Sequence, residues 1–189
     1  MPLASTGALR REIERNFPDR PFRVDFWDRV FPGQLPAGDL DVSIVDERGF
    51  DLEGVSLVPV EVGHTDTEAT TMLHVPQIGL LVAGDVVYNG VHLYLTETGG
   101  VPGIDEWLAA LDTAETLDPA TVIAGHKNPR ASDDPTQIQA TRRYLTDARE
   151  LIESSQHAEA FYEGMLGRHP DRINPGALWG AATTLFPSG

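Results

Sequence analysis

Residues 60–94 have the sequence VEVGHTDTEATTMLHVPQIGLLVAGDVVYNGVHLY, and this stretch decides the fold. Apolar and polar residues alternate over residues 55–62, which overlap its start, and two β-rich runs follow at residues 71–76 and 79–85. Alternation with a period of two is typical of a half-buried strand, whereas a run that is apolar on both faces indicates an interior strand. The sequence therefore predicts a strand over residues 55–62, followed by a hairpin or close pair of strands over residues 71–76 and 79–85.

Further elements extend this pattern in both directions along the chain. A strand is predicted over residues 40–47, a helix over residues 104–117 from its apolar spacing of three and four, and a short buried strand over residues 121–126. Asp-Pro at Asp134 starts a predicted helix that runs through Ile152, and Asn-Pro at Asn174 starts another. The chain is therefore predicted to be α/β, with one domain over residues 1–189, a helical lead-in over residues 1–36 and a helical C-terminal extension over residues 154–189.

The composition narrows the classes of partner. Lys and Arg total 14 against 29 Asp and Glu, which gives a net charge of −15. Such a charge repels nucleic-acid phosphates and anionic lipids, so neither nucleic acid nor a membrane is an expected partner. The sequence has no cysteine, which excludes thiolate metal sites, and it has no apolar run of signal-peptide or membrane-spanning length. We expect a cytoplasmic protein whose metal would be held by His, Asp, Glu or carbonyl oxygen.

Three polar residues, His64, Asp85 and His126, each come directly after a glycine at the end of a predicted strand. A single histidine in such a place is more often a hydrogen-bonded turn residue, so the repetition is the signal. Strand ends of α/β folds are where ligand-binding groups gather, and a glycine lets the backbone turn sharply there. Two imidazoles and one carboxylate suit Zn(II), Fe(II) or Mn(II). The sequence therefore predicts a metal site formed by these three side chains.

The segment after Asp85 contains further candidates. Tyr88, Asn89 and His92 follow it closely and either line a substrate pocket or shape the loop. Asp66 is interpreted as a turn or capping residue, with a hydrogen bond to a metal-binding histidine as the alternative.

The other three histidines are assigned structural or solvated positions. His74 lies inside a predicted strand and is expected to be a half-buried packing residue, whereas His157 and His169 lie in the polar C-terminal part and are expected to be solvated.

The 60–94 stretch, together with VIAGHK at residues 122–127, resembles the second half of a metallo-β-lactamase-fold hydrolase over about residues 40–150. The resemblance implies an αββα sandwich in which His64 binds one metal, Asp85 bridges two and His126 binds the second. It also implies Zn(II) as the metal, with Fe(II) or Mn(II) as alternatives. A metal-activated water would then attack an ester, thioester, lactam or phosphoester in a small-molecule substrate.

The sequence departs from this family in one feature, which leaves two functions open. The family's His-x-His-x-Asp-His motif comes earlier in the chain, but no histidine precedes His64 here. We therefore expect a truncated member that lacks the N-terminal portion with this motif, and whose fold corresponds to the C-terminal half of the sandwich. Two functions remain open: a metal-dependent hydrolase that holds a single metal, or a non-catalytic remnant that acts as a binding or oligomeric scaffold. A homo-oligomer would cover the sheet face that the missing portion leaves open.

Overall fold

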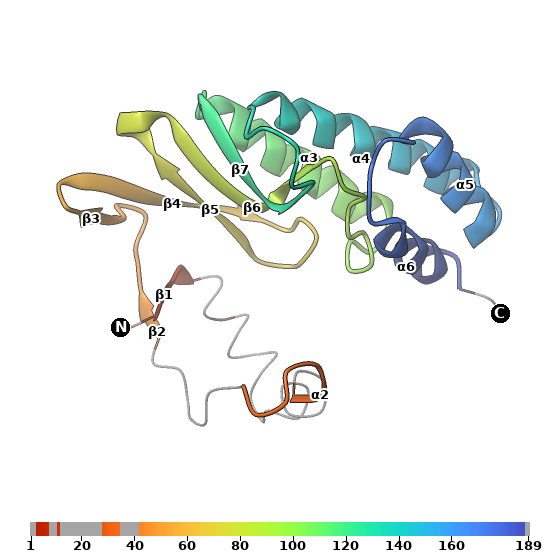
Figure 1. The fold of residues 1–189 in the computed structure, drawn as a ribbon, viewed down its shortest axis with the longest axis horizontal. Helices are drawn as coiled ribbons and strands as arrows, with labels where there is room; N and C mark the ends of the chain where they lie inside the picture. The colour runs from red at the N-terminus through yellow and green to blue at the C-terminus, as the bar shows by residue number, and fades with distance from the viewer. Residues whose placement is uncertain (1–2, 8–10, 12–27, 35–41, 188–189) are drawn as a thin grey trace.

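A mixed five-stranded sheet forms the centre of the computed structural model, which describes residues 3–7, 11, 28–34 and 42–187 (Figure 1). Its strands lie side by side in the order β3 (Phe50–Leu52), β4 (Val55–Gly63), β5 (Thr70–Val75), β6 (Leu80–Asn89) and β7 (Thr121–Lys127). The neighbours from β3 to β6 are antiparallel, and β7 runs parallel to β6. The strands predicted over residues 55–62, 71–76, 79–85 and 121–126 are confirmed, although β6 continues to Asn89.

The helices follow the strands along the chain. They are α3 (Val101–Thr116), α4 (Thr136–Ser154), α5 (Ala158–Arg168) and α6 (Pro175–Leu185), and the 3-10 turn η2 (Pro76–Ile78) joins β5 to β6. Proline occupies the first turn of α3 and of α6, where its missing N–H costs no hydrogen bond. The carboxylate of Asp134 accepts the backbone N–H of Thr136 at 2.8 Å, so this predicted start signal acts at the first residue of α4.

The N-terminal part is described only in pieces. A two-stranded parallel sheet pairs β1 (Leu3–Ser5) with β2 (Val42–Ile44), and the short helix α2 spans Asp28–Val30. The strand predicted over residues 40–47 thus overlaps β2. Much of the helical lead-in predicted over residues 1–36 lies outside the described residues.

The hydrophobic core lies between the sheet and the helices α3 and α4, which cover one of its faces, and it continues between α4, α5 and α6 beyond the end of the sheet (Figure 1). Side chains of β6 and β7 alternate accordingly, so that Leu81 and Val122 are fully buried on the helix side. Large aromatic side chains fill this core. The largest of them are Trp107, Tyr88, Tyr144 and Phe161.

The opposite face of the sheet carries a second set of apolar side chains. Pro59, Leu73, Val82 and Ile123 are successive cross-strand partners from β4 to β7, and partners in register share a face. We call these four residues the outer row. Ile123 is 37% exposed and the other three are half-buried. The outer row is therefore much less covered than the helix side.

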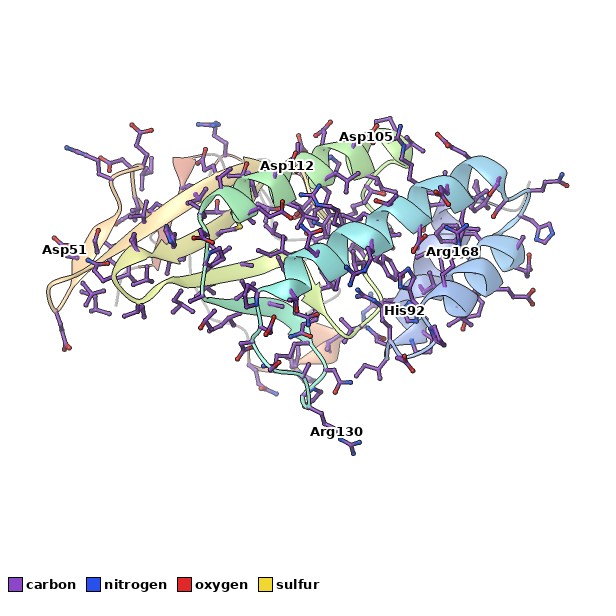
Figure 2. The ribbon with its side chains drawn as sticks, turned by 90° about the horizontal axis from the view of Figure 1, so that it is seen from above. Asp51, His92, Asp105, Asp112, Arg130 and Arg168 are labelled. Atoms are coloured by element: carbon purple, nitrogen blue, oxygen red, sulfur yellow. The ribbon has the colours of Figure 1, made fainter. Side chains whose placement is uncertain are left out.

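Ion pairs join α3 to α4 on the surface. Asp105 and Asp112 of α3, labelled in Figure 2, pair with Arg149 at 3.0 Å and with Arg142 at 2.6 Å. Exposed pairs of this kind contribute about 0.2–1 kcal/mol each, so the helices are held mainly by their buried faces. None of the helices in the described part of the chain is long and apolar enough to cross a membrane.

The chain after α5 returns to the loop that follows β6. Ile173 forms an isolated bridge with Val91, and the guanidinium of Arg172 donates to the carbonyl oxygens of Val91 at 2.6 Å and Ala140 at 3.0 Å. We call residues 169–173 the docking segment. Through these bonds it connects the C-terminal helices to the loop after β6 and to α4.

Candidate metal centre

Asp85 lies in a β-bulge of β6. The register pairs Gly84 with Ala124 and Tyr88 with His126, so three residues of β6, 85–87, face only Gly125 of β7. Gly84 has a φ of 53°, a left-handed conformation that favours glycine. The sequence placed Asp85 at the end of a strand, whereas the structure shows that the bulge turns its side chain while the strand continues.

His126 faces this carboxylate from the neighbouring strand. Its Nε2 lies 3.5 Å from Oδ1 of Asp85, and the two side chains are 58% and 41% exposed. A Cβ on Gly125 would overlap the Asp85 carboxylate and the backbone of Gly84. Gly125 therefore serves the close approach of Asp85 to β7 and not a sharp turn after the strand.

His64 follows β4, as predicted, but its ring is directed to the start of α3. Its Nε2 lies 3.2 Å from the carbonyl oxygen of Glu97, to which it donates, and its Nδ1 lies 3.6 Å from the carboxylate of Glu106. A Cβ on Gly103 would come within 3.1 Å of the His64 ring and would overlap the carbonyl oxygen of Thr98. Both ring nitrogens of His64 thus face acceptors from other parts of the chain.

Asp85 and His126 fit a divalent cation, since a carboxylate oxygen and an imidazole nitrogen are common ligands and both side chains reach solvent. Within the described ranges, no three His, Asp or Glu side chains come close enough together to hold a metal ion. The structure therefore brings two of the three predicted ligands together. His64 as a third ligand stays a prediction. In the structure its Nε2 donates to the carbonyl oxygen of Glu97.

Tyr88 and Asn89, predicted near a substrate, are both buried. Asn89 is 1% exposed, and its amide donates to the carbonyl oxygen of Ser132 at 2.8 Å, which ties β6 to the loop after β7. Tyr88 is 2% exposed and its hydroxyl donates to the carboxylate of Asp66 at 3.2 Å. Substrate contact stays a prediction for both residues, and the structure gives each of them a packing role.

Asp66 lies in the turn between β4 and β5, in agreement with the turn interpretation, and its carboxylate is buried. It is 5% exposed and also accepts a hydrogen bond from the hydroxyl of Thr65 at 3.1 Å. Burial, with the nearby charge of Asp85 as a second cause, raises the pKa of Asp66 to about 6. Burial likewise raises the pKa of Tyr88, which keeps its hydroxyl a donor.

His92 lies beside the docking segment, on the side of the C-terminal helices (Figure 2). It is 1% exposed, its Nδ1 lies 3.0 Å from the hydroxyl of Tyr144, and among the described residues its Nε2 has no hydrogen-bond partner. Burial, with Arg172 and His169 as further causes, lowers the pKa of His92 to about 4. His92 as a substrate contact also stays a prediction, since its ring is enclosed by protein.

The remaining histidines divide differently from the sequence prediction. His157 is exposed and its Nδ1 accepts the N–H of Ala160 at the start of α5. His74 is half-buried in β5, as expected. The prediction that His169 is solvated is wrong: its side chain is 13% exposed, and its Nε2 lies 2.9 Å from Asp147.

Two groups of contacts were not predicted from the sequence. Glu97, Gly103 and Glu106 surround His64, but they come from a loop and a helix whose approach to β4 has no local signal. Trp107 of α3 was not among the candidate residues, yet its indole N–H donates to the carbonyl oxygen of Val86 in the bulge at 2.8 Å. A cavity of about 650 Å³ lies away from the candidate centre, between the N-terminal segment and β4, with Thr6 and Pro59 in its lining.

The sequence matches the family model described as "Metallo-beta-lactamase superfamily" over residues 6–126, which is more than half of the 189 residues. The chain belongs to the metallo-beta-lactamase superfamily. This superfamily generally binds divalent metals. A comparison with curated protein sequences found no match.

Solved metallo-beta-lactamase structures share the fold. A metallo-beta-lactamase from Pontibacter korlensis has a TM-score of 0.55 and 16% identity, over 78% of this chain and 59% of that one. A metallo-beta-lactamase family protein from Thermus thermophilus has a TM-score of 0.59 and 14% identity, over 97% and 64%. A beta-lactamase domain protein from Burkholderia ambifaria has a TM-score of 0.61 and 18% identity, over 98% and 59%. The chain thus spans about three fifths of the length of these structures.

Proposed function

We propose that this protein is a metal-dependent hydrolase in which Asp85 and His126 hold a divalent cation. The observation that carries this proposal is their approach to 3.5 Å across the β6 bulge, with both side chains open to solvent. Zn(II) is the proposed metal, with Fe(II) or Mn(II) as alternatives, because one imidazole and one carboxylate suit all three. When bound, the cation would polarise a carbonyl or phosphoryl oxygen and acidify water.

The residues of this chain have separate parts in the proposed chemistry. Asp85 offers a carboxylate whose direction is set by the bulge, and His126 offers its Nε2 from the parallel neighbour. Gly125 keeps the space between them free of a side chain. His64 would join as a third ligand only by giving up its hydrogen bond to Glu97. The proposed substrates are small molecules with an ester, thioester, lactam or phosphoester bond.

Metal binding tests this proposal directly. Metal-free protein would be titrated calorimetrically with Zn(II) and Mn(II), and its metal content measured after removal of excess metal. We expect one strong site in the unmodified protein and its loss in Asp85→Asn and His126→Gln. His157→Gln is the matched control, because His157 is an exposed histidine 3.2 Å from a carboxylate, that of Glu159. Equal metal content in all four proteins would contradict the assignment of the site.

Activity would then be measured with model substrates. A chromogenic lactam, a nitrophenyl ester, a thioester and a bis-nitrophenyl phosphate cover the four proposed bond classes. We expect hydrolysis of at least one that requires added metal and disappears in Asp85→Asn. Strong metal binding without hydrolysis in any class would reject the hydrolase proposal while leaving the metal site intact.

A second candidate function, an oligomeric scaffold, is favoured by the outer row. Pro59, Leu73, Val82 and Ile123 form an apolar band across four strands on the face opposite α3 and α4. Contact between two such bands would bury apolar surface that one chain leaves half-exposed. Sedimentation velocity of metal-free protein at micromolar concentration tests this candidate: a dimer is expected, and a monomer would contradict it.

A further inference from the structure

The ring of Tyr88 lies against the ring of His126. The two residues are cross-strand partners in β6 and β7, and their ring centroids are 5.1 Å apart with an angle of 26° between the ring planes. His126 is 58% exposed on its side chain, whereas Tyr88 is buried. A buried ring thus forms a fixed wall for an exposed imidazole.

Tyr88 is itself held from several directions. Its ring meets Trp107 edge-on, with centroids 5.8 Å apart and an angle of 62°. Its backbone N–H donates to Oγ1 of Thr141 at 3.1 Å, and the hydroxyl of Thr141 donates back to the carbonyl oxygen of Tyr88 at 3.1 Å. Contacts on the ring and on both backbone groups leave Tyr88 little freedom to rotate.

The hydroxyl of Tyr88 connects this wall to the loop after β4. It donates to Oδ2 of Asp66, whose Oδ1 accepts the hydroxyl of Thr65. The hydroxyl of Thr65 also lies 2.7 Å from that of Thr70 at the start of β5. The loop between β4 and β5 therefore reaches His126 through one buried ring.

We propose that Tyr88 is a positioning residue, which holds the imidazole of His126 in the orientation that presents Nε2 to Asp85, and that Asp66 fixes Tyr88 in turn. The proposal rests on the proposed function only for its effect on cation affinity. The physical reason is that an exposed histidine otherwise samples several rotamers, and immobilising it on binding costs entropy. A ligand that is already oriented avoids this cost.

The orientation itself is measurable in the metal-free protein. A proton above the face of an aromatic ring is shifted upfield, so the His126 ring protons should have NMR shifts displaced from those of a free histidine. In Tyr88→Leu these shifts should return toward free values. In Tyr88→Phe, which keeps the ring but loses the hydrogen bond to Asp66, they should lie between the values of the unmodified protein and those of Tyr88→Leu. Free-histidine shifts in the unmodified protein would overturn the proposal without recourse to any variant.

Cation affinity gives the second readout. Calorimetric titration with Zn(II) should show about tenfold weaker binding in Tyr88→Leu, within the range typical for residues that orient a metal ligand. Tyr162→Leu is the matched control, because Tyr162 packs edge-on against Trp179 at 5.3 Å between α5 and α6. Unchanged affinity in Tyr88→Leu, with binding intact in the unmodified protein, would overturn the positioning role. If the unmodified protein binds no metal, the hydrolase proposal fails, and the NMR shifts still decide the orientation.

Discussion

Gly125 controls how closely Asp85 approaches β7. The carboxylate of Asp85 occupies the position that a Cβ of residue 125 would take, so any side chain there would displace it. The distance between Asp85 and His126 therefore depends on a residue that offers no ligand atom of its own.

We expect Gly125→Ala to weaken cation binding and to lower the free energy of unfolding by about 1–3 kcal/mol, because added atoms force a packed region apart. Urea unfolding and calorimetric titration measure the two effects. Gly180→Ala is the control, since open space surrounds Gly180 in α6. It should leave stability equal or raise it by about 0.5–1 kcal/mol. No change in Gly125→Ala would mean that Asp85 moves aside without cost.

At the scale of residues, the sequence identified candidate side chains but did not predict all of their contacts. The glycines before Asp85 and His126 precede two side chains that lie 3.5 Å apart, and their role as metal ligands stays a prediction. The same pattern at His64 led to a residue that contacts Glu97 and Glu106. The difference is physical. The strands β6 and β7 are neighbours whose register brings their side chains together, whereas the partners of His64 come from the loop before α3 and from α3 itself, whose approach to β4 no local pattern encodes.

The β6 bulge and α3 form one unit at the scale of elements. Trp107 is fully buried in α3, and its indole N–H satisfies the carbonyl oxygen of Val86, one of the extra residues of the bulge. A bulge leaves backbone groups without a ladder partner, so a donor from a neighbouring helix stabilises it. The helix thereby helps to set the direction of Asp85.

Trp107→Phe should lower the free energy of unfolding by about 1–3 kcal/mol, because the carbonyl of Val86 would remain buried without its donor. Urea unfolding followed by circular dichroism measures the change. Trp179→Phe provides the comparison, since Trp179 is 42% exposed and should change stability much less. Equal losses in the two variants would argue against a specific role of the indole N–H.

His92, which lies beside the docking segment, makes the stability of the fold depend on pH. Burial with Arg172 and His169 lowers the pKa of His92 from 6.5 to about 4. The unfolded chain therefore takes up this proton near pH 6.5, whereas the folded chain does so only near pH 4. The contribution of His92 to stability should be fully present above pH 6.5 and should fall by up to about 3 kcal/mol as the pH decreases to 4. The raised pKa of Asp66 acts in the opposite direction over the same range.

Urea unfolding at several pH values between 7 and 4 tests this dependence. His92→Gln should remove this contribution. The dependence that remains is due to His169, whose pKa is also lowered by burial and by Arg172, and to Asp66, whose raised pKa acts in the opposite direction. His157→Gln should keep the full dependence, because His157 lies on the surface. An unchanged slope in His92→Gln would exclude His92 as the source.

The order of strands and helices from residue 55 onward could be predicted from periodicity and from proline signals. The bulge could not, because extra residues become visible only when β6 is aligned with β7. The docking segment could not either, since Arg172 acts on carbonyl oxygens of Val91 and Ala140, far from it along the chain. Patterns within one element predict that element, and contacts between distant segments need the fold.

At the scale of the whole molecule, charge and the outer row have opposite effects on self-association. The net charge of −15 keeps copies of the chain apart, whereas the apolar outer row favours their contact. Salt screens the first effect, since the Debye length falls from about 10 Å at 0.1 M to about 3 Å at 1 M. The balance therefore depends on ionic strength.

For the scaffold candidate, sedimentation velocity should show more dimer in 1 M salt than in 0.1 M salt. Ile123→Lys should shift the protein to monomer in both, because a charge would enter the outer row. Ile78→Lys is the matched control, since Ile78 is 63% exposed in the turn between β5 and β6 and lies outside the row. Loss of the dimer in both variants would assign the effect to charge alone.

The hydrophobic core extends beyond the part of the chain that matches the family model. The family match ends at His126, but the core continues through Phe161, Leu178 and Ala182, all fully buried. A protein trimmed to the matched residues would expose the surfaces that these side chains cover. The smallest stable unit that contains the candidate centre is therefore longer than the segment that matches the family model, and the C-terminal helices belong to it.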